Sequence, residues 1–160
     1  MEPADGAVAL VDGNVAAACL FGKNSIDKAL EAGSMLMTTE EATAAGITSF
    51  DITSVTDKFI KENPELVRAF LEVTAESNAL FAAGNSDMAV IAKDAGMSVE
   101  KTTNQMSGFG FPTPEEQKSS WLNSGGKVEG MLAFMGNMFA TAENPALSDY
   151  SKTIDASFLP

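Results

Sequence analysis

The sequence of this 160-residue chain contains no histidine and only one cysteine, Cys19. The absence of histidine excludes Ser-His-Asp and Cys-His catalysis, and it removes the commonest general base of enzymes. A single cysteine cannot form an internal disulfide, and zinc sites built from cysteine and histidine are excluded as well. An enzyme would therefore have to rely on carboxylates, lysines or a cofactor.

Basic residues are also scarce, since 10 Lys and Arg face 22 Asp and Glu, and Arg68 is the only arginine. The resulting net charge of −12 would repel a nucleic-acid backbone and an anionic membrane surface. No apolar run approaches the roughly 20 residues that span a bilayer. We therefore expect no nucleic-acid partner and no direct insertion into a membrane.

Motifs that would indicate catalysis or a cofactor are incomplete. In "SGGKVEG", Val128 follows Lys127 where a phosphate-binding loop has Ser or Thr, and the first glycine is missing. The acid pairs Glu40–Glu41 and Glu115–Glu116 are adjacent on predicted helices, so their carboxylates do not converge on one point. We expect no enzymatic activity, no metal and no cofactor.

The N-terminal part has the pattern of an α/β protein. "VAAACLF" (15–21) is apolar throughout and uncharged, as in a strand buried on both faces, and Gly22 ends it. Ser25 is then a candidate cap for a short helix. "SMLMTT" (34–39) predicts a further strand. In "GITSFDITS" (46–54), apolar and polar residues alternate with a period of two, which also predicts a strand.

The chain from Val55 onward is predicted to be helical. Asn63 and Pro64 are suited to begin a long helix whose buried stripe would consist of Leu66, Phe70, Val73 and Leu80. The last long helix, from Gly125, places apolar residues at steps of three and four. We interpret these as core, with a methionine groove for a partner helix as the alternative; they are Val128, Met131, Leu132, Met135, Met138 and Phe139.

Two features are candidates for a binding site. The turn Leu20–Ser25 leads from a predicted strand into a helix start, where unpaired N–H groups can hold an anion. An ordinary strand–helix turn explains this segment equally well. Asp51 is the second feature, because aspartate is disfavoured in strands and this one lies where the character of the chain changes. A carboxylate there could pair with a ligand ammonium group, or could simply face solvent.

Three blocks of the sequence together resemble solute-binding proteins of ABC importers for taurine, aliphatic sulfonates and nitrate, and the taurine-binding branch most closely. They are "GNVAAACLFGKNS", "GITSFDITSVTDKFIKENPELVRAFLEVTAESNALF" and "LSDYSKTIDASFL". The resemblance extends over nearly the whole chain, but only over the second half of the family's usual length. We therefore expect a fragment that lacks the N-terminal half. The chain departs from the family at Asn14 and Ala16, where relatives carry acids, and at Lys23 and Asn24.

The resemblance implies an α/β fold, a partial two-lobe periplasmic binding protein of type II with a helix-rich C-terminal part. Residues 1–48 would finish the second lobe, 49–54 would be a crossover strand, and 55–160 would complete the first lobe. Asp51 matches the family's crossover acid, which pairs with the taurine amine. Phe21 matches a cleft aromatic, and the segment Gly22, Lys23, Asn24 and Ser25 would help to hold the sulfonate.

The implied function is capture of taurine or a related aminosulfonate outside the cytoplasm, in the periplasm, for delivery to an ABC permease in the membrane. Within the same family, an alkanesulfonate, nitrate or pyrimidine binder is the alternative. An alternative of another class is a cytosolic acidic helical protein that binds partners through Met131, Met135 and Met138.

Overall fold

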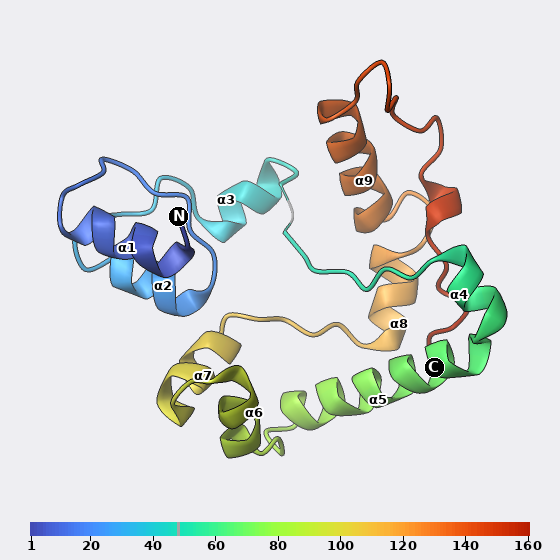
Figure 1. Ribbon diagram of the computed structural model, residues 1–160, viewed down its shortest axis with the longest axis horizontal. Helices are drawn as coiled ribbons and strands as arrows, with labels where there is room; N and C mark the ends of the chain where they lie inside the picture. The colour runs from blue at the N-terminus through green and yellow to red at the C-terminus, as the bar shows by residue number, and fades with distance from the viewer. Residues whose placement is uncertain (48) are drawn as a thin grey trace. The chain divides into compact units, whose positions relative to one another are not determined.

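The computed structural model describes residues 1–47 and 49–160, and every regular element in these ranges is a helix (Figure 1). Helices account for 54% of the chain. In chain order they are α1 (Pro3–Val11), α2 (Lys23–Ala29), α3 (Thr39–Ala44), α4 (Asp57–Glu62), α5 (Pro64–Ala82), α6 (Met88–Ala95), α7 (Val99–Met106), α8 (Pro114–Glu116), the π-helical turn η1 (Gln117–Trp121), α9 (Lys127–Met138) and the 3-10 turn η2 (Ser151–Thr153).

The predicted α/β class, and with it the partial type II binding-protein fold, is wrong for the described residues, because they contain no strand. The segments 15–21, 34–38 and 49–54 have no regular structure, and Thr48 lies outside the described residues. A strand is stable only when a neighbouring strand satisfies its backbone N–H and C=O groups. The segments have the apolar and alternating patterns of strands. In the described chain, however, no neighbouring strand pairs with them, so they form no sheet.

The chain divides into two compact units, which we describe separately. Unit 1 consists of Met1–Ala45 and Ser86–Gly110, and unit 2 consists of Gly46–Asn85 and Phe111–Pro160. The division near residue 45 lies close to the first predicted boundary, whereas residues 86–110 join the N-terminal unit. The predicted division into 1–48, 49–54 and 55–160 stays a prediction.

Small side chains form the packed centre of unit 1. Within this unit α1 packs on α2, α2 on α7, and α6 on α7. The buried residues at these contacts include Ala7, Ala29, Ala92 and Thr102. Because these side chains are short, helix backbones can approach closely, but little apolar area is removed from water.

Aromatic contacts hold unit 2 together. The rings of Phe50 and Trp121 meet edge to face with centroids 5.7 Å apart, and Phe81 meets Phe111 in the same way at 5.2 Å. The C-terminal segment lies against α5, since the Arg68 guanidinium sits 4.8 Å from the centre of the Phe158 ring. Contacts of this kind join segments that are far apart in the sequence.

Two apolar stripes predicted to be core are largely exposed. On α5, Leu66, Phe70, Val73 and Leu80 retain 59%, 55%, 61% and 52% of their accessible surface. On α9, Val128 is buried, but Met135 and Met138 are 41% and 56% exposed. The interpretation of these stripes as core is therefore wrong except near Val128. Helical spacing places residues on one face, but it does not supply a surface to cover that face.

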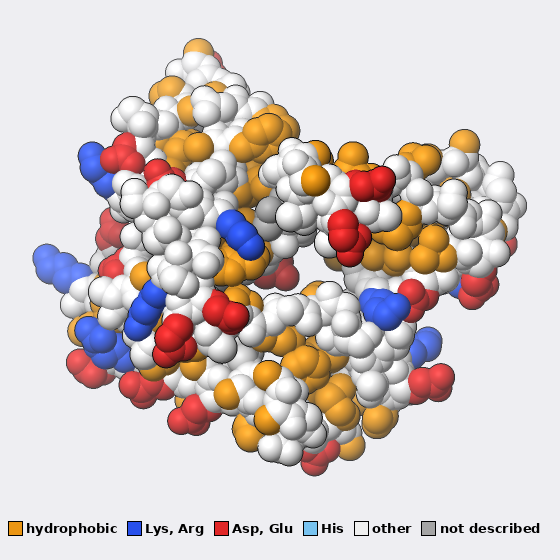
Figure 2. All heavy atoms as spheres, turned by 180° about the vertical axis from the view of Figure 1, so that it is seen from behind, with side chains coloured by type: hydrophobic (Ala, Val, Ile, Leu, Met, Phe, Trp, Pro, Cys, Tyr) orange, Lys and Arg blue, Asp and Glu red, His pale blue; other side chains and the backbone are white. Residues whose placement is uncertain are grey.

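The described chain exposes more surface than its size requires. Its accessible surface is 11365 Å². Two separate folded bodies of about 70 and about 90 residues would expose roughly 9,200 Å² together. Apolar side chains contribute visibly to this surface (Figure 2). The two units taken separately would expose at least the 11365 Å² of the whole chain. The excess over roughly 9,200 Å² therefore belongs to the units themselves.

None of the helices in the described ranges combines the length and the apolar character needed to cross a membrane.

Candidate functional site

Four of the six candidate residues lie at the start of α2 in unit 1. Gly22 precedes the helix with φ +81°, a left-handed conformation that favours glycine, and Lys23 is the first helical residue. The prediction that Ser25 caps this helix is wrong, because Ser25 lies inside it and its backbone N–H donates to the Gly22 carbonyl at 3.1 Å. Phe21, which the resemblance matches to a cleft aromatic, is 75% exposed.

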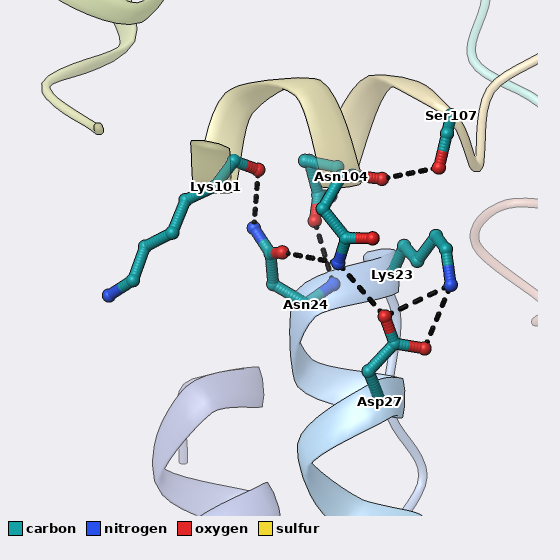
Figure 3. A network of polar contacts seen from close by, with 7 residues as sticks. Lys23, Asn24, Asp27, Lys101, Asn104 and Ser107 are labelled. Atoms are coloured by element: carbon teal, nitrogen blue, oxygen red, sulfur yellow. Dashed lines mark hydrogen bonds and ion pairs between the residues drawn. The ribbon is translucent and has the colours of Figure 1, made fainter. Parts of the chain in front are cut away.

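Polar side chains join the start of α2 to α7 (Figure 3). The Asn24 backbone N–H donates to Gln105 Oε1 at 3.0 Å, and Asn24 Nδ2 donates to the Lys101 carbonyl at 3.0 Å. Asn104 Nδ2 donates to both Asn24 Oδ1 and Asp27 Oδ2, each at 2.8 Å. We call these residues the α2–α7 network. It connects positions about 80 residues apart in the sequence.

Asp27 is the negatively charged member of the α2–α7 network. Lys23 Nζ lies 2.9 Å from both of its carboxylate oxygens. The hydrogen bond from Asn104 and then the bond and charge of Lys23 hold the pKa of the Asp27 carboxyl below its ordinary value. The Asp27 carboxylate therefore stays ionised to lower pH than a free aspartate. Figure 3 shows that the Lys101 side chain extends away from the network.

One backbone N–H donor at the start of α2 already has a hydrogen-bond partner within the α2–α7 network. The Asn24 N–H, one of the groups predicted to hold an anion, points at the Gln105 amide oxygen. A Cβ atom at Gly22 would lie 2.6 Å from Gln105 Nε2, so Gln105 fits closely against the glycine. An anion binding here would have to displace Gln105. Gly22 and Asn24 both contact Gln105 within unit 1. A role for these two residues in ligand binding stays a prediction.

Asp51 lies in unit 2, on the irregular segment 49–54, and is exposed. Two hollows in unit 2 are formed without it. One, of about 270 Å³, is lined by Gly46 and by α9 residues Lys127, Gly130, Met131 and Phe134. The other, of about 60 Å³, lies where residues 111–114 pass along α5. The pairing of Asp51 with a ligand amine stays a prediction.

Sequence reasoning missed Asn104 and Gln105. Their importance depends on contacts with residues 24 and 27, which no local pattern reveals. One weak signal was present: "KTTNQ" places only polar residues on a helix whose inner face buries Thr102. A polar inner face indicates a partner that offers hydrogen bonds, although it does not identify that partner.

In the part of the chain that the structure describes, no three Asp, Glu or Cys side chains are grouped closely enough to hold a metal ion. Comparisons of the sequence and structure with protein-family models, curated proteins and solved structures found no significant match.

Proposed function

We propose that this chain is part of an extracytoplasmic solute-binding component of an ABC importer, and that the intact protein binds taurine or a related aminosulfonate. The proposal concerns function only. The α/β fold of that family is not part of it, because the described residues contain no strand. Three ordered sequence blocks resemble the taurine-binding branch of that family. The family's ABC permease would be the membrane partner.

The observation that carries the proposal is that the apolar segments of these blocks lack cover. In 15–21, Ala16, Ala17, Ala18 and Cys19 are exposed, and Ile52 beside Asp51 is 50% exposed. Leaving such segments in water is unfavourable by about 25 cal/mol for each Å² of apolar surface. Further protein that covers them would remove this cost, as expected for a piece of a larger binding protein.

The chemistry of taurine fits the candidate residues one group at a time. Its ammonium group would form a charge-assisted hydrogen bond with the exposed carboxylate of Asp51. The N–H groups at the start of α2 in unit 1 stay the candidate for binding a sulfonate, and Lys23 Nζ beside them is paired with Asp27. Because Gln105 accepts the Asn24 N–H, sulfonate binding there would compete with this side chain.

Calorimetry on the protein encoded by the intact gene tests the proposal. Asp51→Asn should weaken taurine binding about tenfold to a hundredfold, since hydrogen bonds to charged groups contribute roughly 1.5–3 kcal/mol. Ethanesulfonate lacks the amine, so its affinity should not change. Asp57→Asn, which removes another exposed acid six residues away, is the matched control.

Three results would contradict the proposal in different ways. Equal losses for taurine and ethanesulfonate would remove the amine role of Asp51. Binding of nitrate, a pyrimidine or an alkanesulfonate without taurine would favour the alternative within the family. Absence of binding to every one of these ligands would reject a solute-binding function.

A second candidate function is an acidic helical interaction protein, and the helical structure of the described residues favours it. Phe134, Met135 and Met138 of α9 form an exposed apolar surface of the kind that binds partner helices. The sequence upstream of Met1 in the gene separates the two candidates. A signal peptide followed by a further lobe supports the solute-binding protein, whereas a stop codon and ribosome site support the interaction protein.

A further inference from the structure

A straight ridge, apolar except at Ser77, runs along one side of α5. It consists of Leu66, Phe70, Val73, Ser77 and Leu80, spaced by four, three, four and three residues, and every member is exposed. This is the spacing of the seam between two helices that pack at a shallow angle. At 1.5 Å per residue the ridge is about 21 Å long, or four helical turns.

Unit 2 covers a different side of α5. The residues that directly follow ridge positions, among them Val67, Leu71, Asn78 and Phe81, are half-buried. Phe81 meets Phe111, and residues 111–114 pass along this side of the helix. The helix is therefore apolar on two adjacent faces, and its own unit packs against only one of them.

The other border of the ridge is acidic. Glu65, Glu72 and Glu76 directly precede ridge residues and are spaced by seven and four, so they share one face. All three are exposed, and no hydrogen bond or ion pair to their side chains is found within residues 1–47 and 49–160. The one cation at the far side of the helix, Arg68, contacts Phe158 and the Ser157 carbonyl instead.

Charge decides which surface can cover this ridge. Unit 1 has 10 acidic and 4 basic side chains and unit 2 has 12 and 6, so each unit carries a net charge of −6. Neither unit 1 nor a second copy of the chain therefore brings the excess positive charge that the acidic border would attract. A surface with the opposite sign would gain both apolar burial and electrostatic complementarity.

We propose that the α5 ridge is a docking site for an amphipathic helix of another protein, with an apolar stripe facing Leu66–Leu80 and Lys or Arg residues along the edge that meets Glu65, Glu72 and Glu76. The heptad-like spacing specifies a helix as the partner element, and the acidic border specifies its charge and its orientation about the ridge axis. This inference does not depend on the solute that the protein binds.

Two designed peptides test the proposal on the full chain. Both are fluorescein-labelled amphipathic helices of 18 residues with leucines at alternating steps of three and four. One carries lysines beside the leucine stripe, and the other carries glutamates at the same positions. Fluorescence anisotropy should show that the lysine peptide binds at least tenfold more tightly than the glutamate peptide.

Variants of α5 should redirect this binding. The triple change Glu65→Lys, Glu72→Lys and Glu76→Lys should reverse the preference between the peptides. The same charge change at Glu40, Glu100 and Glu143, which are exposed elsewhere, should leave the preference as it was. Phe70→Ser should weaken binding of the lysine peptide at least tenfold, whereas Val90→Ser, at a similarly exposed apolar residue of α6, should not.

Several outcomes would overturn the proposal. Reversal by the control triple would show attraction to overall charge instead of docking at α5. Equal effects of Phe70→Ser and Val90→Ser would place the apolar contact elsewhere. A concentration-dependent dimer in sedimentation that Phe70→Ser abolishes would identify a second copy as the occupant. Failure of both peptides to bind would show that the ridge does not dock an amphipathic helix.

Discussion

Unit 1 and unit 2 hold their helices together with different interactions. Unit 1 packs small residues such as Ala29 and Ala92 and joins α2 to α7 through the side-chain amides of Asn24, Asn104 and Gln105. Unit 2 relies on rings, including the pair Phe50–Trp121. The hydrogen bonds of unit 1 should be weakened by changes in geometry or charge. The ring packing of unit 2 should be weakened by changes in side-chain volume.

The unfolding of the two units can be followed separately because the fluorescent side chains lie in only one of them. The only tryptophan, Trp121, and the only tyrosine, Tyr150, both belong to unit 2. Trp121 fluorescence therefore follows unfolding of unit 2, while far-UV circular dichroism follows the helices of both units. A variant that weakens only unit 1 should shift the circular dichroism transition without shifting the fluorescence transition.

The largest effect is expected in unit 2 from Gly136→Ala. A Cβ atom at this position of α9 would overlap the ring of Tyr150, which packs on the glycine. We expect the free energy of unfolding of unit 2 to fall by about 1–3 kcal/mol, the usual cost of overpacking. Denaturant titration followed by Trp121 fluorescence measures this change.

Gly130→Ala is the matched control for this prediction, because its Cβ would meet open space on the same helix. It should leave unit 2 as stable or make it more stable by up to about 1 kcal/mol, since alanine favours helix over glycine. Equal losses for the two variants would show that helix α9, and not the Tyr150 contact, is sensitive to substitution.

The next largest effect is expected in unit 1 from Gly22→Ala. This change is unfavourable in two ways, because φ is +81° and the new Cβ would approach Gln105 Nε2. We expect a loss of about 1–2 kcal/mol in the stability of unit 1, from the left-handed backbone conformation with the contact added. The loss should appear in circular dichroism, with the Trp121 transition unchanged.

Gly13→Ala is the control for a positive φ without a close contact, because Gly13 has φ +72° and no atoms within 4 Å of its Cβ position. It should show the backbone cost alone. Adding Gln105→Ala to Gly22→Ala should recover the contact cost. If Gln105→Ala recovers none of the loss caused by Gly22→Ala, the close fit of Gln105 makes no contribution.

The smallest effect concerns pH. Because Asn104 and Lys23 lower the pKa of the Asp27 carboxyl in the folded chain, the unfolded chain takes up this proton first as pH falls. The stabilisation from Asp27 is present above its ordinary pKa and is lost as pH falls through the lower folded value. Asp27→Asn should therefore make the stability of unit 1 less dependent on pH in the acidic range.

Circular dichroism melts of the chain and of Asp27→Asn at several acidic pH values measure this difference. Glu41, whose pKa Thr38 lowers through the cap of α3, also titrates in unit 1 and is common to both proteins. Its contribution therefore cancels in the comparison. Identical pH dependence of the two proteins would show that the α2–α7 network makes no electrostatic contribution.

Local signals in the sequence were sufficient for several helix ends. The stretch "TPEE" (113–116) has the sequence pattern of a capping box, and the structure forms it: Thr113 Oγ1 accepts from the Glu116 N–H, and Glu116 Oε2 accepts from the Thr113 N–H. Pro64 begins α5 as expected, whereas Asn63, the expected cap, makes no capping hydrogen bond through its side chain. These interactions join residues that are only a few positions apart, so short stretches of sequence contain all the partners.

The lack of strands in the described residues could not be predicted in the same way, and neither could the surroundings of the candidate residues. A strand depends on a partner that is distant in the sequence, and the segment 15–21 has none in the described chain. The contact of Gln105 with Asn24 spans 81 residues. Both depend on which distant segments meet, which periodicity does not specify.

The sequence by itself determined the acidic charge, the lack of histidine chemistry, the capping box at Thr113 and the apolar stripes, because each of these is a property of composition or of neighbouring residues. Only the tertiary structure decided which side of α5 is packed against unit 2, and that Gln105 fills the hydrogen-bonding position at the start of α2. Burial and long-range hydrogen bonds form only when segments distant in the sequence pack together. The free energy of this packing depends on both segments, so neither segment alone determines it.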